Sequence, residues 1–220
     1  MGVTIRFYLA SGNAHKALEL QALARAGGTA AEIRSARELG GMPEVAEDTG
    51  SFLGNARKKA RALRAQAPPS AWVLADDSGL CVDALGGAPG VESAYYAGPQ
   101  GDGAANLAKL VAALQGVPDG ARGAHFVCVL VAVAPDGTEW TFEGRCEGAL
   151  LRAPRGRAGF GYDPLFVPAG EARSLAELGE ERKNQLSHRA RAWSQLASRL
   201  PALQNLGQSP GHGFESPIPP

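Results

Sequence analysis

The feature that most constrains the fold is a nine-residue apolar run, followed by a tight turn and a second segment typical of a strand. Residues 126–134 are nine consecutive apolar residues, residues 138–142 read Thr-Glu-Trp-Thr-Phe, and Pro135-Asp136-Gly137 lies between them. Pro and Gly favour the backbone angles of a turn between antiparallel strands. The pattern predicts a β-hairpin with a buried first strand. Nine residues are also far fewer than the ~20 that a membrane-spanning helix needs, so we expect no membrane partner.

Helical and strand patterns alternate along the rest of the chain. The expected strands cover residues 3–10, 72–75, 81–85 and 147–151, and the expected helices cover residues 14–26, 51–63, 104–114 and 189–200. Asn13 and Ser51 are suitable N-caps, and Pro201 is expected to end the last helix. A hairpin inserted among βα units predicts an α/β fold around a mixed sheet.

Composition narrows the possible partners. The 220 residues include 22 basic and 22 acidic side chains. This balance gives no overall basic field for nucleic acid or an anionic membrane. Cys81, Cys128 and Cys146 form no CxxC pair, which favours a reducing, cytoplasmic environment. The length suits one large domain, placed here at residues 1–206.

Residues 207–220 are predicted to be a disordered tail. This segment is rich in Gly and Pro and has no apolar periodicity, so it cannot offset an ordering cost of ~1–2 kcal/mol per residue. We expect that truncation after Leu206 leaves activity and melting temperature essentially unchanged. A loss of several degrees, or a shift of the oligomer in light scattering, would instead show that Phe214 and Ile218 dock on a groove.

The first cluster with chemical potential follows the first predicted strand. It reads Ser11, Gly12, Asn13, Ala14, His15, Lys16. Small residues at a helix N-terminus let backbone amides approach an anion, and Lys16 adds a charge. The alternative is a capped helix with a solvated lysine. The chain has neither GxxxxGK nor GxGxxG, so the common nucleotide-binding loops are not indicated.

The second cluster is Asp76-Asp77-Ser78-Gly79, predicted as the turn between two strands. Adjacent carboxylates suit Mg²⁺, which takes one or two carboxylates together with substrate phosphates. Neighbouring residues in extended chain point to opposite sides, so one of the two Asp residues is expected to reach the metal. Glu47 could supply another ligand. An Asp-rich β-turn without a metal is the alternative.

Two further clusters lie in the last third of the chain. Gly159-Phe160-Gly161-Tyr162-Asp163 leaves an aromatic ring free to stack on a base, and its alternative is an aromatic core corner. Lys183 with Ser187-His188-Arg189 supplies hydrogen-bond donors, and its alternative is a polar helix N-terminus.

Taken together, the four clusters resemble the inosine triphosphate pyrophosphatase family, which acts on non-canonical purine nucleoside triphosphates. The resemblance spans about residues 3–200. Its most specific parts are residues 75–98, which contain the paired Asp residues, and Gly-Phe-Gly-Tyr-Asp-Pro at 159–164. Two departures stand out: Tyr95 replaces a common Arg, and His15 replaces a commonly small residue.

The resemblance implies an elongated α/β fold with two lobes around a central nucleotide-binding cleft, usually in a homodimer. It implies Mg²⁺-dependent hydrolysis of dITP, ITP and XTP to the monophosphate and pyrophosphate. A related pyrophosphatase of other base specificity, and a non-catalytic nucleotide-binding protein, stay as alternatives. Asp77 is implied as proton acceptor and metal ligand, with Glu47 as the second ligand. The implied nucleotide contacts are Ser11, Gly12, Asn13, Ala14, His15, Lys16, Ser78, Phe160, Gly161, Tyr162, Asp163, Lys183, His188 and Arg189.

Overall fold

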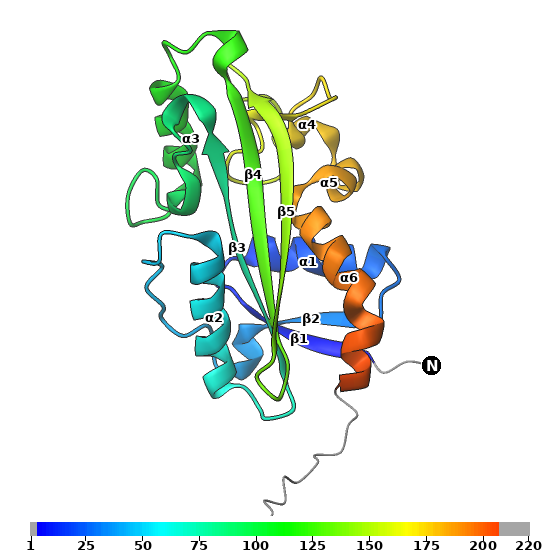
Figure 1. Ribbon diagram of the computed structural model, residues 1–220. Helices are drawn as coiled ribbons and strands as arrows, with labels where there is room; N and C mark the ends of the chain where they lie inside the picture. Colours follow the sequence, from blue (N-terminus) through cyan, green and yellow to red (C-terminus); the bar gives the residue numbers. More distant parts are fainter. Residues whose placement is uncertain (1–3, 207–220) are drawn as a thin grey trace, which may run out of the picture.

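One six-stranded mixed sheet organises the protein (Figure 1). In this computed structural model, residues 4–206 are described, and the predicted tail lies outside them. The strand order is β2-β1-β3-β4-β5-β6, in which β1 runs parallel to β2 and β3 and the other pairs are antiparallel. The strands are β1 (Ile5–Ala10), β2 (Ala31–Ser35), β3 (Trp72–Val82), β4 (Gly123–Val133), β5 (Glu139–Leu150) and β6 (Phe166–Pro168). The α/β prediction is confirmed.

Helices cover both faces of the long strands. They are α1 (Ala14–Ala26), α2 (Phe52–Gln66), α3 (Gly103–Ala113), α4 (Leu175–Leu178), α5 (Glu180–Leu186) and α6 (His188–Leu206). In Figure 1, α2 lies on one side of β3–β5 and α6 on the other. The helices α3, α4 and α5 lie toward the end of β4 and β5 that is opposite the turn joining these two strands. Within residues 4–206, no helix is both long and apolar enough to cross a bilayer.

Alternate residues of the long strands supply two different cores. Leu74 and Leu130 pack with α1 and α6, whereas Val73 and Val129 pack with α2. This follows from the two-residue side-chain period of a strand. A third core, which includes Phe166, fills the end of the sheet near α3 and α4. Asp76, Asp77 and Ser78 lie in the middle of β3, beside these cores.

The predicted hairpin is confirmed, and its second strand is longer than expected. β4 and β5 pair from Gly123↔Ala149 to Val133↔Glu139, so the separate strand expected at 147–151 is the continuation of β5. Both predicted N-caps are also present: Asn13 accepts from two amides of α1, and Ser51 accepts from the Gly54 amide of α2.

Two predicted boundaries are wrong. The predicted turn at 76–79 is the interior of β3, which pairs with β4 without interruption from Val73↔Val133 to Val82↔Ala124. The last helix also does not stop before Pro201 but continues to Leu206. Leu200 and Leu203 are both buried in the core under α6, and this packing holds the last turns despite the hydrogen bond that proline removes.

Candidate active site

The site begins where β1 ends beside the middle of β3. The register Ala10↔Ala75 places residues 11–16 next to Asp76, Asp77 and Ser78. Gly79 lets the loop at 90–93 approach this strand, since a Cβ there would lie 2.2 Å from the Gly90 carbonyl oxygen. Two pockets open at this junction, and we name them from their linings as the carboxylate pocket and the aromatic pocket.

Asp77 lies in the carboxylate pocket, on the α2 face of the sheet. Its Oδ1 accepts from Lys59 Nζ at 2.6 Å, and the same ammonium lies 3.2 Å from Glu47 Oε2. Asp77 Oδ2 is buried and has no hydrogen-bond partner among the described residues. Burial raises the pKa of Asp77 to about 6, against the opposing attraction of Lys59 and Lys16. One carboxylate oxygen is therefore left for a ligand.

Asp76 points to the opposite face and is fully buried. Its carboxylate accepts from Arg189 Nε at 2.8 Å and pairs with Lys16 Nζ at 2.7 Å. The Ser78 hydroxyl at 3.0 Å and the Cys128 thiol at 3.3 Å also donate to it. Burial alone would raise the pKa of Asp76, but Arg189 and Lys16 outweigh it and hold that pKa well below its usual value. Asp76 thus fixes two cations rather than offering an open ligand.

A second set of buried charges lies beneath Asp76. Glu19 of α1 contacts both Lys183 and Arg189, and Lys183 Nζ lies 2.8 Å from Asp163 Oδ2. Burial would raise the pKa of Glu19, but these two cations lower it overall. Glu19 was not among the predicted site residues. The available signal was a carboxylate on the helix face that also carries the buried Leu20 and Leu23.

Lys59 was also missed as a site residue. It stands on α2, where Ala56, Ala60 and Leu63 mark the buried face. Its pKa is raised, because the attraction of Asp77 and Glu47 exceeds the lowering effect of burial. A lysine three residues from the buried Ala56 and four from the buried Leu63 was the signal that could have found it.

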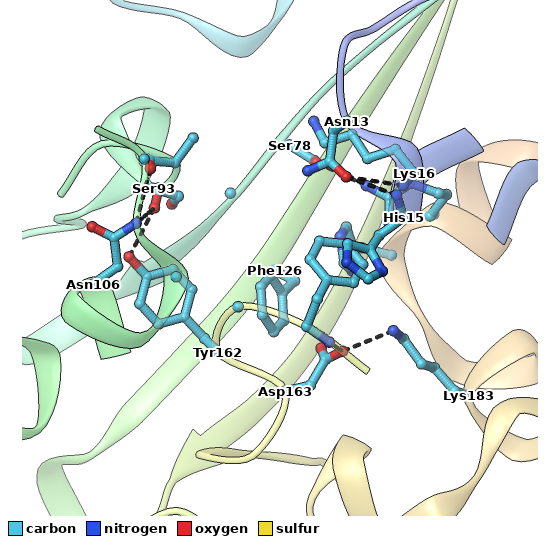
Figure 2. Close-up of a pocket in the computed structure, with 18 residues that line it drawn as sticks. Asn13, His15, Lys16, Ser78, Ser93, Asn106, Phe126, Tyr162, Asp163 and Lys183 are labelled. Atoms are coloured by element: carbon cyan, nitrogen blue, oxygen red, sulfur yellow. Dashed lines mark hydrogen bonds and ion pairs between the residues drawn. The ribbon is translucent and has the colours of Figure 1, made fainter. Parts of the chain in front are cut away.

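The aromatic pocket, about 360 Å³ in volume, lies between α1, the 159–163 loop and the start of α6 (Figure 2). That volume is within the usual range for small-ligand sites. His188 stacks on Phe126 with centroids 4.7 Å apart, and its buried Nδ1 has no partner among the described residues. Burial and the nearby Arg189 charge lower the pKa of His188 well below its usual value. The pocket therefore presents a neutral imidazole.

Tyr162 shapes this pocket through its hydroxyl group. The hydroxyl donates to the Ser93 carbonyl at 2.9 Å, and Asn106 Nδ2 donates to the neighbouring Ala94 carbonyl at 2.8 Å. Figure 2 shows Tyr162, Ser93 and Asn106 together at the α3 side of the pocket. Tyr162 is only 4% exposed, so in this structure it holds the 93–94 loop against the pocket.

Some backbone amides at the start of α1 already donate hydrogen bonds to neighbouring side chains. Asn13 Oδ1 accepts from the amides of His15 and Lys16, and Ser11 Oγ accepts from the amide of Asn13. The amides of Gly12 and Ala14 have no acceptor among residues 4–206. The anion-binding capacity predicted for this loop thus rests on those two amides and on Lys16, with the positive end of the helix dipole behind them.

The predicted residues divide between the two pockets. The carboxylate pocket is lined by Ser11, Gly12, Asn13, Lys16, Glu47, Asp77 and Ser78. The aromatic pocket is lined by Asn13, His15, Lys16, Ser78, Phe160, Gly161, Tyr162, Asp163, Lys183, His188 and Arg189. Ala14 lines neither of these two. Because Asn13, Lys16 and Ser78 line both, the two pockets adjoin.

Fold and site together define an α/β nucleotide-binding protein, because a pocket lined by aromatic rings adjoins a pocket that carries cations and carboxylates. Residues 7–199 match the family model described as the Ham1 family. The chain belongs to the Ham1 family. The resemblance found in the sequence is confirmed.

Relatives support this assignment along nearly the whole chain. A dITP/XTP pyrophosphatase of Opitutus terrae is 63% identical over 197 residues, which are 88% of this chain and 97% of that protein. A HAM1 protein from Coxiella burnetii has a similar structure, with a TM-score of 0.78, 36% identity and coverage of 90% of this chain and 99% of that one. A nucleoside-triphosphatase/dITP/XTP pyrophosphatase from Mycobacterium abscessus gives a TM-score of 0.69 and 43% identity, covering 87% and 98%.

Proposed function

We propose that this protein hydrolyses non-canonical purine nucleoside triphosphates, namely dITP, ITP and XTP, to the monophosphate and pyrophosphate. The observation that carries this proposal is that the two pockets adjoin and share Lys16 and Ser78 in their linings. A base in the aromatic pocket would direct its phosphates past Lys16 toward Asp77. The 63% identical relative is named for this substrate class, which supports the same assignment.

We propose Mg²⁺ as the metal, held by Asp77 and Glu47. The residues present fit such an ion, because Asp77 Oδ2 is a buried oxygen without a partner among the described residues, and Glu47 lines the same pocket. Residues 4–206 contain no group of three or more metal-ligating side chains, so substrate phosphates and water would complete the shell. When bound, the ion would neutralise phosphate charge and lower the pKa of a water molecule.

The protein's own groups have separate roles in the proposed reaction. Asp77 accepts the proton of the attacking water at its carboxylate. Lys16, with the free amides at the start of α1, binds the departing pyrophosphate. Lys59 holds Asp77 and Glu47 together, since its ammonium contacts both. Asp76 keeps Lys16 and Arg189 in place from beneath the pocket.

Selectivity is proposed to rest on the 6-position of the purine. Hypoxanthine and xanthine carry an acceptor there, whereas adenine carries a donor. Arg189 is fixed by Asp76, Glu19 and Ser78 and lines the pocket as a donor. His188 Nδ1, which has no hydrogen-bond partner among the described residues, is a second polar atom for the base. A buried donor left facing another donor can discriminate by about 10⁴–10⁵.

The first prediction is the substrate profile. With Mg²⁺, we expect dITP and XTP to be hydrolysed far faster than dATP, dGTP or dUTP, measured as pyrophosphate release with the nucleotide product identified by chromatography. Fastest turnover of dUTP or of the standard purines would favour the pyrophosphatase of other specificity. Binding without turnover would favour the non-catalytic alternative, and orthophosphate plus a diphosphate as primary products would contradict attack at the α-phosphate.

The proposal extends to the assembly and location implied by the family. We propose a homodimer, which light scattering coupled to size exclusion would measure directly. We also propose a cytoplasmic location, where the nucleotide pool is found.

A further inference from the structure

The imidazole ring of His15 lies flat on the ring of Phe160. The two centroids are 5.1 Å apart and the ring planes differ by 15°, which is the geometry of an offset stack. Both rings line the aromatic pocket with His188 and Arg189. In Figure 2, His15 reaches into this pocket from the start of α1.

Phe160 is the fixed member of the pair. It stands between Gly159 and Gly161, which have φ of +76° and +60°. Its amide donates to Asp163 Oδ2 at 2.9 Å, and a Cβ on Gly159 would approach that oxygen to 2.2 Å. Asp163 is buried and ion-paired with Lys183. The backbone that carries the Phe160 ring is therefore held from beneath.

His15 is the free member. Its backbone amide is fixed by the Asn13 cap, but its side chain is exposed and makes no hydrogen bond to residues 4–206. The stack on Phe160 is thus the contact that keeps the imidazole in the pocket. Pairs of this geometry are worth about 2- to 12-fold in an equilibrium constant, which ligand binding can reverse.

The spacing decides how a base could use this face of Phe160. Stacked rings have centroids at least about 4.5 Å apart, so two successive stacks need far more than the 5.1 Å between His15 and Phe160. A purine that stacks on this face must replace the imidazole. Imidazole is also the five-membered ring of a purine, so His15 offers Phe160 a surface of the same kind.

We propose that His15 occupies the base position on Phe160 in the nucleotide-free protein and that the purine displaces it. This makes His15 an affinity-determining residue, because every substrate must first break the stack. The inference rests on the proposed function and adds an internal competitor to it.

The kinetic test compares His15→Ala with His15→Phe. We expect His15→Ala to lower the KM for dITP by about 2- to 12-fold, the factor that the stack contributes, with a smaller change in kcat. His15→Phe keeps a ring on Phe160, so its KM should stay at or above that of the parent protein. An unchanged KM in His15→Ala would show that the base does not compete for this face. A raised KM would show that His15 instead contacts the bound base and stabilises it.

A binding measurement separates this inference from the proposed function. In protein with labelled histidines, the ring current of Phe160 should shift the His15 ring protons upfield, and added dIMP should return them downfield. A further upfield shift, or a shift of His188 signals without one of His15, would contradict the displacement while leaving nucleotide binding intact. No shift of any histidine, together with no turnover of dITP, would contradict the proposed function and the inference with it.

Discussion

Replacing Asp77 with Asn is expected to lower the kcat for dITP by about 10²-fold or more. The amide keeps the shape of the side chain but removes the charge and the proton acceptor. Asp77 Oδ2 is the buried oxygen without a partner among the described residues, so Asp77 has an atom available for the reaction. Steady-state pyrophosphate release with Mg²⁺ measures the effect, and circular dichroism confirms that the variant is folded.

Asp76→Asn is the matched control for this prediction. Asp76 is adjacent in β3 but points to the other face, where Arg189 and Lys16 already occupy its oxygens. Its loss should act through those two cations and therefore raise the KM for dITP. If Asp77→Asn turned over dITP near the parent rate while Asp76→Asn did not, the proton acceptor would have been assigned to the wrong carboxylate.

Local signals predicted much of the fold. The Pro135-Asp136-Gly137 turn, the apolar run before it and the strand-like segment after it specify the hairpin without help from distant residues, and the Asn13 cap geometry is likewise local. These features depend on backbone angles and on the side-chain period of a strand, and both follow from the residue types of the segment itself. The fold class followed from their order along the chain.

The interruption predicted at Asp76-Asp77 was wrong for a reason that lies elsewhere in the chain. Two adjacent carboxylates disfavour a buried strand when considered alone. In the protein, Arg189 neutralises Asp76 and Lys59 neutralises Asp77, each on its own face of β3. These partners are 113 and 18 residues away, so the sequence around the Asp pair does not show that the charges are balanced.

The same limit explains which site residues were found. The predicted clusters are short motifs, and the structure places nearly all of their residues along two adjoining pockets. Glu19 belongs to no such motif, and Lys59, which shares in the family resemblance, was assigned no role. Each takes its role from a partner brought close by folding. The stacking of His15 on Phe160 could not be predicted for the same reason, since the two residues are 145 positions apart in the chain (160 − 15).

The second large effect is expected from Glu19→Gln, in the stability of the protein. Glu19 is 8% exposed and contacts both Lys183 and Arg189. Removing its charge leaves two buried cations with fewer counter-charges, although Asp163 and Asp76 still pair with them. We expect the free energy of unfolding to fall by about 2–4 kcal/mol. This lies at the lower end of the usual cost of breaking a buried ion pair, because the amide oxygen of Gln still accepts a hydrogen bond.

Urea unfolding monitored by circular dichroism measures this loss. For a chain of this length, a loss of that size should lower the melting temperature by roughly 5–15 °C. Glu32→Gln is the matched control, because Glu32 also contacts two cations, Arg6 and Arg34, but is 41% exposed at its side chain. Water screens such surface pairs, so the control should shift the urea midpoint far less. Equal midpoints for the two variants would mean that the buried charges beneath Asp76 position the site without stabilising the fold. A lower midpoint for Glu19→Gln alone, with an unchanged slope, would assign the loss to the native ion pairs.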